Sequence, residues 1–136
     1  MFMDRQQHID LILDHYQHPR HRGALNQAHA TRLGGNPGCG DVVTVYLAVD
    51  PSDSRVHLSF EGEGCTISMA TASMVVEMMQ GWTLDQVESA TPEPVFAMLG
   101  PEITSARQRC ATLAFNTVKE ACRDYRRQQL GDLAGL

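Results

Sequence analysis

The segment at residues 66–80, TISMATASMVVEMMQ, carries apolar or small side chains around almost its whole circumference when it is drawn as a helix. Its most polar residues fall on a narrow arc formed by Thr66, Ser73, Glu77 and Gln80. A helix with so little polar surface is stable in water only where other elements cover most of it. The segment therefore predicts a buried helix packed against a sheet, which restricts the fold more than any other feature of the sequence.

Two runs rich in β-branched residues precede this helix and are the source of the expected sheet. The runs VVTVYLAVD (42–50) and RVHLSFEG (55–62) flank the turn signal PSDS, which predicts an antiparallel hairpin. A short edge strand is expected near ATRL, before the sequence Gly-Gly-Asn-Pro-Gly. The sequence thus predicts an α+β fold, in which a small antiparallel sheet of about three strands is covered on one face by helices.

The N-terminal segment at residues 4–17, DRQQHIDLILDHYQ, places apolar side chains at helical spacing, and Pro19 ends the pattern. We therefore expect an N-terminal helix that docks on the rest of the chain. Three histidines, at positions 15, 18 and 21, straddle the end of this helix and are expected on the solvated surface.

The C-terminal half shows two further helical signals. Thr83 and Gln86 form a capping box that predicts a short helix, and prolines at 92, 94 and 101 interrupt the segment that follows. A last helix is predicted from about Cys110 to Gln128.

Composition limits the class of protein. With 136 residues, 43% of them hydrophobic, the chain is sized for one domain spanning residues 1–136. A net charge of −5 offers no broad cationic surface, which argues against a nucleic-acid partner. No apolar run approaches the roughly 18 residues that a membrane span needs, and the N-terminus resembles no signal peptide, so we expect a cytoplasmic protein. Four cysteines in that compartment are better explained as thiols or metal ligands than as disulfides.

Three of these cysteines lie at boundaries between predicted elements. Cys39 precedes the first hairpin strand, Cys65 opens the buried helix and Cys110 opens the last helix. Because a helix N-terminus favours a thiolate, Cys65 and Cys110 are expected to be more acidic than a free cysteine. The glycines that flank Cys39 and Cys65 would let a ligand approach either sulfur.

The fourth cysteine, Cys122, differs from the others. It lies twelve residues beyond Cys110 on the same predicted helix, which places it roughly 18 Å away along the helix axis. Its helical face also carries Ala111, Phe115 and Val118. We therefore interpret Cys122 as a buried structural thiol that is too distant to share a metal with Cys110.

Asp41 is the candidate fourth ligand. If residues 39–43 are extended, the side chains of Cys39 and Asp41 point to the same side. Together with Cys65 and Cys110 they make a four-ligand set suited to tetrahedral zinc or to the two irons of a small iron–sulfur cluster. Taken alone, an aspartate after a glycine is more often a turn or cap residue, so the Cys-x-Asp pair is weak evidence by itself.

Four motifs in order resemble the IscU/SufU and NifU N-terminal-domain family of iron–sulfur cluster assembly scaffolds. They are LILDHYQHPRHRGAL, NPGCGDVV, GEGCTISMATASMV and RQRCATLAF, and the resemblance covers nearly the whole chain. It implies a SufE/NifU-like fold, with Cys39, Asp41, Cys65 and Cys110 holding iron, a [2Fe–2S] cluster or zinc. It further implies that these cysteines accept persulfide sulfur from a cysteine desulfurase, and that the nascent cluster passes to apo-proteins or cluster carriers.

Two departures from the family pattern leave its subtype open. IscU-type members carry His immediately before the third cysteine, whereas this chain has Arg109, with Arg107 two positions earlier, which is similar to SufU. SufU-type members usually have an insertion of about twenty residues that the 44 residues between Cys65 and Cys110 do not contain. In either subtype, the two arginines are candidates for keeping nearby thiolates ionised.

Three functions are compatible with these residues. The first is a non-enzymatic cluster scaffold, and the second is a zinc-dependent sulfurtransferase that relays persulfide to another scaffold. The third, a structural zinc module, is disfavoured because such sites usually draw closely spaced cysteine pairs from zinc knuckles.

Overall fold

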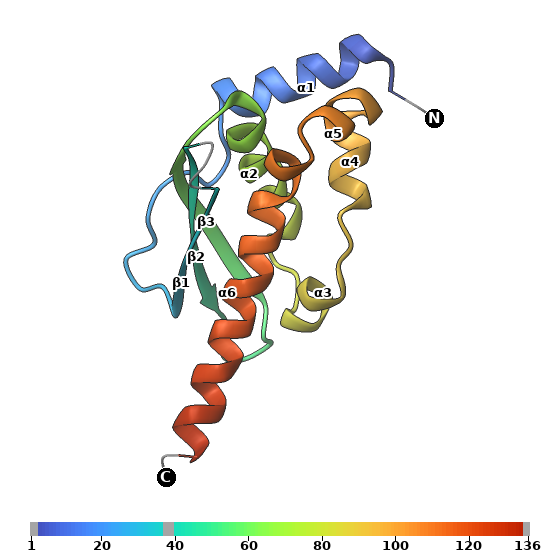
Figure 1. Ribbon diagram of the computed structural model, residues 1–136. Coiled ribbons are helices and arrows are strands. Elements are labelled where there is room, and N and C mark those ends of the chain that lie inside the picture. Colours follow the sequence, from blue (N-terminus) through green and yellow to red (C-terminus); the bar gives the residue numbers. More distant parts are fainter. Residues whose placement is uncertain (1–2, 37–39, 135–136) are drawn as a thin grey trace.

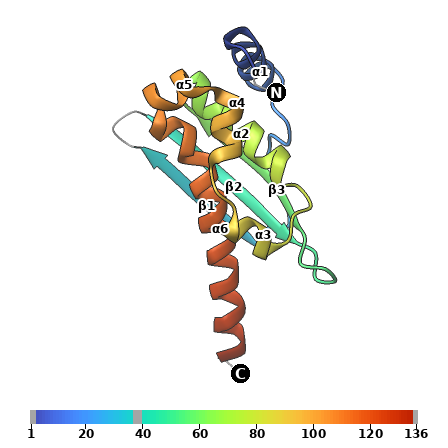
Figure 2. The same ribbon diagram turned by 90° about the vertical axis from the view of Figure 1, so that its right-hand side faces the viewer.

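The computed structural model describes residues 3–36 and 40–134. Its elements follow in the order α1 (Arg5–Gln17), β1 (Ala30–Asn36), β2 (Asp41–Val49), β3 (Val56–Glu63), α2 (Thr66–Met79), α3 (Leu84–Ser89), α4 (Glu93–Leu99), α5 (Pro101–Ala106) and α6 (Gln108–Ala134). The strands form one antiparallel sheet in the order β1-β2-β3. Helices α2 and α6 cover one of its faces (Figures 1 and 2). The predicted α+β fold is therefore confirmed.

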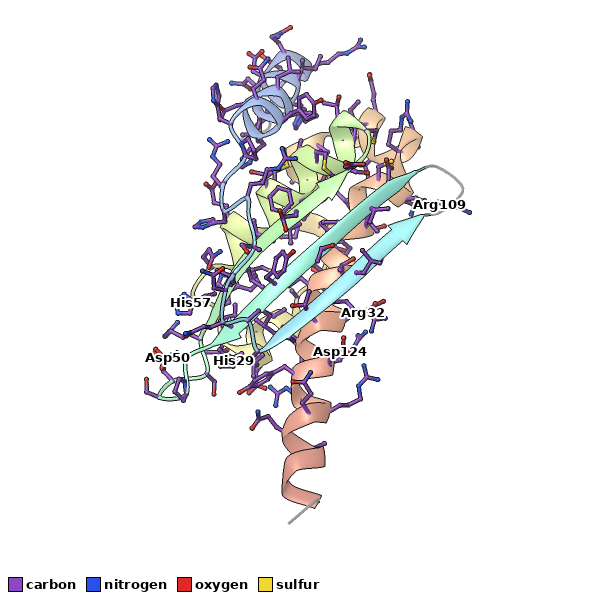
Figure 3. The ribbon with its side chains drawn as sticks, turned by 90° about the vertical axis from the view of Figure 1, so that its left-hand side faces the viewer. His29, Arg32, Asp50, His57, Arg109 and Asp124 are labelled. Atoms are coloured by element: carbon purple, nitrogen blue, oxygen red, sulfur yellow. The ribbon has the colours of Figure 1, made fainter. Side chains whose placement is uncertain are left out.

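The core lies between the sheet and these two helices. Alternate residues of β2, from Val43 to Val49, are buried, as the period of a half-covered strand requires. Ten of the fourteen residues of α2 are buried, which confirms that this helix is interior. Figure 3 looks onto the opposite face of the sheet, which neither α2 nor α6 covers.

Strand β1 is longer than the sequence pattern indicates. It continues past ATRL through Gly34 and Gly35 to Asn36, paired with β2 along its whole length. A Cβ atom at Gly34 would lie only 2.0 Å from Oγ1 of Thr117 on α6. The glycine therefore permits the close contact between strand and helix that positions the N-terminal part of α6 against the sheet.

Helix α1 docks on the polar arc of α2, and here one expectation is wrong. His15, expected on the surface, is 4% exposed, and its Nδ1 lies 2.7 Å from Oγ of Ser73. The backbone N–H of Arg20 donates to the same Oγ, and its guanidinium lies 3.4 Å from Glu77. Burial lowers the pKa of His15, with a further contribution from the Arg20 charge. The polar arc is thus a helix–helix contact surface.

The structure of the C-terminal half agrees with the prediction from the sequence except at the prolines. Thr83 caps α3 in the predicted capping box with Gln86. Pro94 and Pro101 lie in the first turns of α4 and α5; because the first helical N–H needs no partner, proline begins these helices rather than only interrupting the chain. Helix α6 begins before Cys110 and extends beyond Gln128. None of the described helices has the length and apolar character that crossing a membrane requires.

The Gly34–Thr117 contact generates a stability prediction. Gly34→Ala should lower the free energy of unfolding by about 1–3 kcal/mol, because the added methyl group overpacks the strand–helix contact. Gly35→Ala is the matched control, since its Cβ would meet no atom closer than 3.4 Å. Urea unfolding of both variants measures the difference, and equal stabilities would contradict the assigned role of Gly34.

Candidate metal centre at the end of the sheet

Three predicted ligand residues converge at one end of the helix-covered sheet. Asp41 is the first residue of β2, Cys65 is the N-cap of α2, and Cys110 lies in the first turn of α6. Their ligand atoms all lie within 4.8 Å of one another. The two sulfurs are 3.4 Å apart, and Sγ of Cys110 lies 3.2 Å from Oδ2 of Asp41. Arg109, the neighbour of Cys110, is labelled at this end of the sheet in Figure 3.

The glycines before Cys65 are required for the backbone to build this site. A Cβ atom at Gly64 would lie 2.5 Å from Oδ1 of Asp41, and one at Gly62 would lie 2.4 Å from the carbonyl oxygen of Val42. The sequence suggested that these glycines admit a ligand to the Cys65 sulfur. In the structure they admit the Asp41 carboxylate and the neighbouring strand instead.

Asp41 is 4% exposed, and donors surround its carboxylate. Oδ1 accepts the backbone N–H of Cys65 at 2.8 Å, and Oδ2 accepts the hydroxyl of Ser68 at 2.9 Å. Burial opposes ionisation, but these bonds and one from the Cys110 thiol hold the pKa of Asp41 below its ordinary value. The group is therefore a carboxylate, the form that binds a metal ion.

The two thiols differ in acidity, and the expectation is confirmed for only one of them. Burial opposes ionisation of Cys65, but hydrogen bonds from the side chain and backbone of Ser68 hold its pKa below the ordinary value. Burial raises the pKa of Cys110 to about 11, and the adjacent Cys65 and Asp41 add to this rise. The prediction of an acidic Cys110 is therefore wrong, because burial, together with the groups that face the thiol, outweighs its position in the first helical turn.

The donor chemistry of the three residues fits a metal ion. Two thiols and a carboxylate are ligands that zinc accepts and that iron–sulfur clusters also use. Cys39, the predicted fourth ligand, lies outside the described residues. The expected extended backbone over residues 39–43 is wrong at Gly40, which lies in a turn with a φ of 73° directly before β2 begins at Asp41. The ligand roles of all four residues stay a prediction.

The remaining predicted residues lie around or away from this site. Cys122 is fully buried on α6, as expected of a structural thiol, and burial raises its pKa to about 12. Arg107 and Arg109 are exposed. Among the described residues, no hydrogen bond joins either arginine to Asp41, Cys65 or Cys110. Their support of the thiolates stays a prediction.

Ser68 is the site residue that the sequence reasoning missed. It is buried, and besides its bond to Asp41 its backbone N–H donates to Sγ of Cys65 at 3.4 Å. The available signal was its place three residues after the N-cap of α2, where a backbone N–H points back to the capping side chain.

The family model described as "NifU-like N terminal domain" matches residues 7–132. The chain belongs to this family. It is 34% identical over 120 residues to the iron–sulfur cluster assembly scaffold protein IscU 1 of Archaeoglobus fulgidus, with 88% of this chain and 76% of that protein covered. It is 33% identical over 129 residues to the zinc-dependent sulfurtransferase SufU of Bacillus subtilis, with 81% of this chain and 85% of that protein covered.

Solved structures agree with this assignment. A structure from Fervidobacterium islandicum AW-1, described as a candidate iron–sulfur cluster assembly scaffold protein for the SUF system, matches with a TM-score of 0.67 and 26% identity, covering 83% of this chain and 94% of that one. A NifU-like N-terminal protein from Brucella abortus matches with a TM-score of 0.70 over 88% of this chain and 98% of that one. At 22% identity, the second likeness shows the fold alone.

The unequal thiol acidities generate a reactivity prediction. In protein treated with a chelator, iodoacetamide at mildly alkaline pH should modify Cys65 on the order of tenfold faster than Cys110, because only the thiolate reacts. Peptide mass mapping over time measures both rates, and Cys122 should react only after unfolding. Faster modification of Cys110 than of Cys65 would contradict the assigned order of pKa values.

Proposed function

We propose that this protein is an iron–sulfur cluster assembly scaffold, which binds iron and persulfide-derived sulfur and passes a nascent [2Fe–2S] cluster to other proteins. The observation that carries the proposal is the convergence of Asp41, Cys65 and Cys110 from three separate elements onto one spot. Cys39 completes the ligand set. The sulfur donor is a cysteine desulfurase in the cytoplasm, and the acceptors are apo iron–sulfur proteins or cluster carriers.

The exposure of the ligands supports a cargo site over a structural one. Cys65 and Cys110 are both partly exposed, whereas Asp41 is buried behind them. A persulfide or an acceptor thiol can therefore approach the two sulfurs from solvent without displacing the core. The three cysteines are the candidate persulfide acceptors, because a thiolate attacks the outer sulfur of a persulfide.

A zinc-dependent sulfurtransferase is the second candidate function, and Arg109 favours it. This arginine stands before Cys110 where IscU-type members carry histidine, and the chain is similar to a SufU protein named for that activity. The length of the chain favours the scaffold instead. The SufU alignment spans 129 positions but uses only 81% of this chain, so SufU has residues that are missing here.

One experiment separates the two functions. Protein purified without oxygen is analysed for zinc and iron, and then incubated with a cysteine desulfurase and cysteine, either with ferrous iron and dithiothreitol, which reduces persulfide sulfur to the sulfide of a cluster, or with neither. A scaffold develops visible cluster absorbance that requires iron. A sulfurtransferase keeps its zinc, accelerates the desulfurase and carries a persulfide without iron. If neither result is obtained, both proposals are wrong.

The ligand assignment predicts how cysteine variants behave. Cys65→Ser and Cys110→Ser should each weaken zinc binding by on the order of 100-fold or more, because a serine hydroxyl is a poor ligand beside a thiolate. Cys122→Ala should bind zinc like the parent. Competition with a chromophoric chelator measures the affinities, and loss of zinc in the Cys122 variant alone would overturn the assignment.

Asp41 should be the weakest ligand, because a carboxylate is harder and less covalent toward cluster iron than a thiolate. Asp41→Ala is therefore expected to hold a reconstituted cluster longer than the parent and to transfer it more slowly to an apo-ferredoxin. The decay of cluster absorbance and the transfer rate are measured side by side. Faster decay without slower transfer would mean that Asp41 is an ordinary stabilising ligand.

A further inference from the structure

The hydroxyl of Ser68 lies between two of the ligand atoms. Ser68 is 2% exposed on α2, and its Oγ is 2.9 Å from Oδ2 of Asp41 and 3.5 Å from Sγ of Cys65. The hydroxyl donates its one hydrogen to Oδ2 while its oxygen accepts from the Cys65 thiol, so it can donate to a Cys65 thiolate only by leaving Oδ2. Ser68 therefore touches the candidate metal centre without being one of its ligands.

The two oxygens of Asp41 are held by different donors. The backbone N–H of Cys65 donates to Oδ1, which fixes the direction of the carboxylate whatever residue stands at position 68. The Ser68 hydroxyl donates to Oδ2, the oxygen that lies 3.2 Å from Sγ of Cys110 and therefore faces the other ligands. The hydroxyl thus donates to the oxygen that faces the other ligand atoms, and the N–H bond to Oδ1 orients the side chain without it.

We propose that Ser68 is a positioning residue that speeds release of the bound metal by competing for Oδ2 of Asp41. This inference rests on the proposed function, since it requires that the centre binds a metal. When Asp41 is off the metal, the hydroxyl stabilises its free carboxylate. When Asp41 is on the metal, the hydroxyl turns to Sγ of Cys65.

The direction in which the loss of Ser68 changes metal binding and release distinguishes two opposite roles for this residue. If Ser68 only oriented Asp41, its loss would weaken metal binding and hasten release, as is common for residues that hydrogen-bond a metal ligand. If it competes for Oδ2, its loss removes a stabilising partner of the free carboxylate. The metal then binds more tightly and leaves more slowly.

The test uses Co²⁺ as the probe, with Ser68→Ala compared against the parent protein. Thiolate-to-cobalt charge-transfer absorbance reports the metal, and excess EDTA starts its release. We expect Ser68→Ala to release Co²⁺ about tenfold more slowly, with unchanged charge-transfer intensity because the thiolate ligands are the same. Ser73→Ala is the matched control, since Ser73 is equally buried on α2 but contacts His15 and Arg20.

A double variant shows whether Ser68 acts through Asp41. In an Asp41→Ala background, adding Ser68→Ala should leave the release rate unchanged, whereas a general loosening of α2 would change it there too. If Ser68→Ala releases Co²⁺ as fast as the parent or faster, the inference is wrong. It is also wrong if adding Ser68→Ala to Asp41→Ala slows the release as much as it does in the parent. A parent protein without any thiolate-to-cobalt band overturns the metal centre itself, and with it the role of Ser68.

Discussion

The buried carboxylate of Asp41 is the contact on which the arrangement of this molecule's functional end depends. A buried charge is costly unless donors surround it, and here the donors come from α2 and α6. Asp41 is the first residue of β2, so the hydrogen bonds that its carboxylate accepts connect the sheet to both of the helices that cover the sheet. The close approach requires Gly64, because a side chain there would collide with Asp41.

The fold was largely predictable because its main signals are periodic. The apolar circumference of α2 and the alternation in β2 each indicate what must be buried. Periodicity does not reveal which partner satisfies a polar side chain, and this explains the error at His15. Its partner Ser73 lies 58 residues away on another helix, where the sequence pattern shows it only as part of a narrow polar arc. The full length of β1 was missed for a similar reason, since Gly34 is explained only by a threonine on α6.

The candidate site was predictable in its residues but not in its electrostatics. Placement at element boundaries identified Cys65 and Cys110, and the two-residue spacing from Cys39 identified Asp41; the structure brings these three together. The acidity of a thiol depends on all the groups that face it, including those from distant parts of the chain. Burial raises the pKa of Cys110, and the carboxylate and second thiol that it faces raise it further, although the helix terminus alone would lower it. Sequence spacing cannot supply that information.

The position of the site relative to the core explains why the proposed ligand exchange is compatible with a stable fold. The largest fully buried side chains belong to β2, β3, α2 and the helices around them. A small zinc module lacks such a core and folds only when its metal binds. In this chain, β2, α2 and α6 all contribute side chains to the apolar core, so we expect their backbone to stay in place if a ligand leaves a bound metal. Such a site can release a bound cluster without unfolding, which a cluster scaffold requires and a structural zinc site does not.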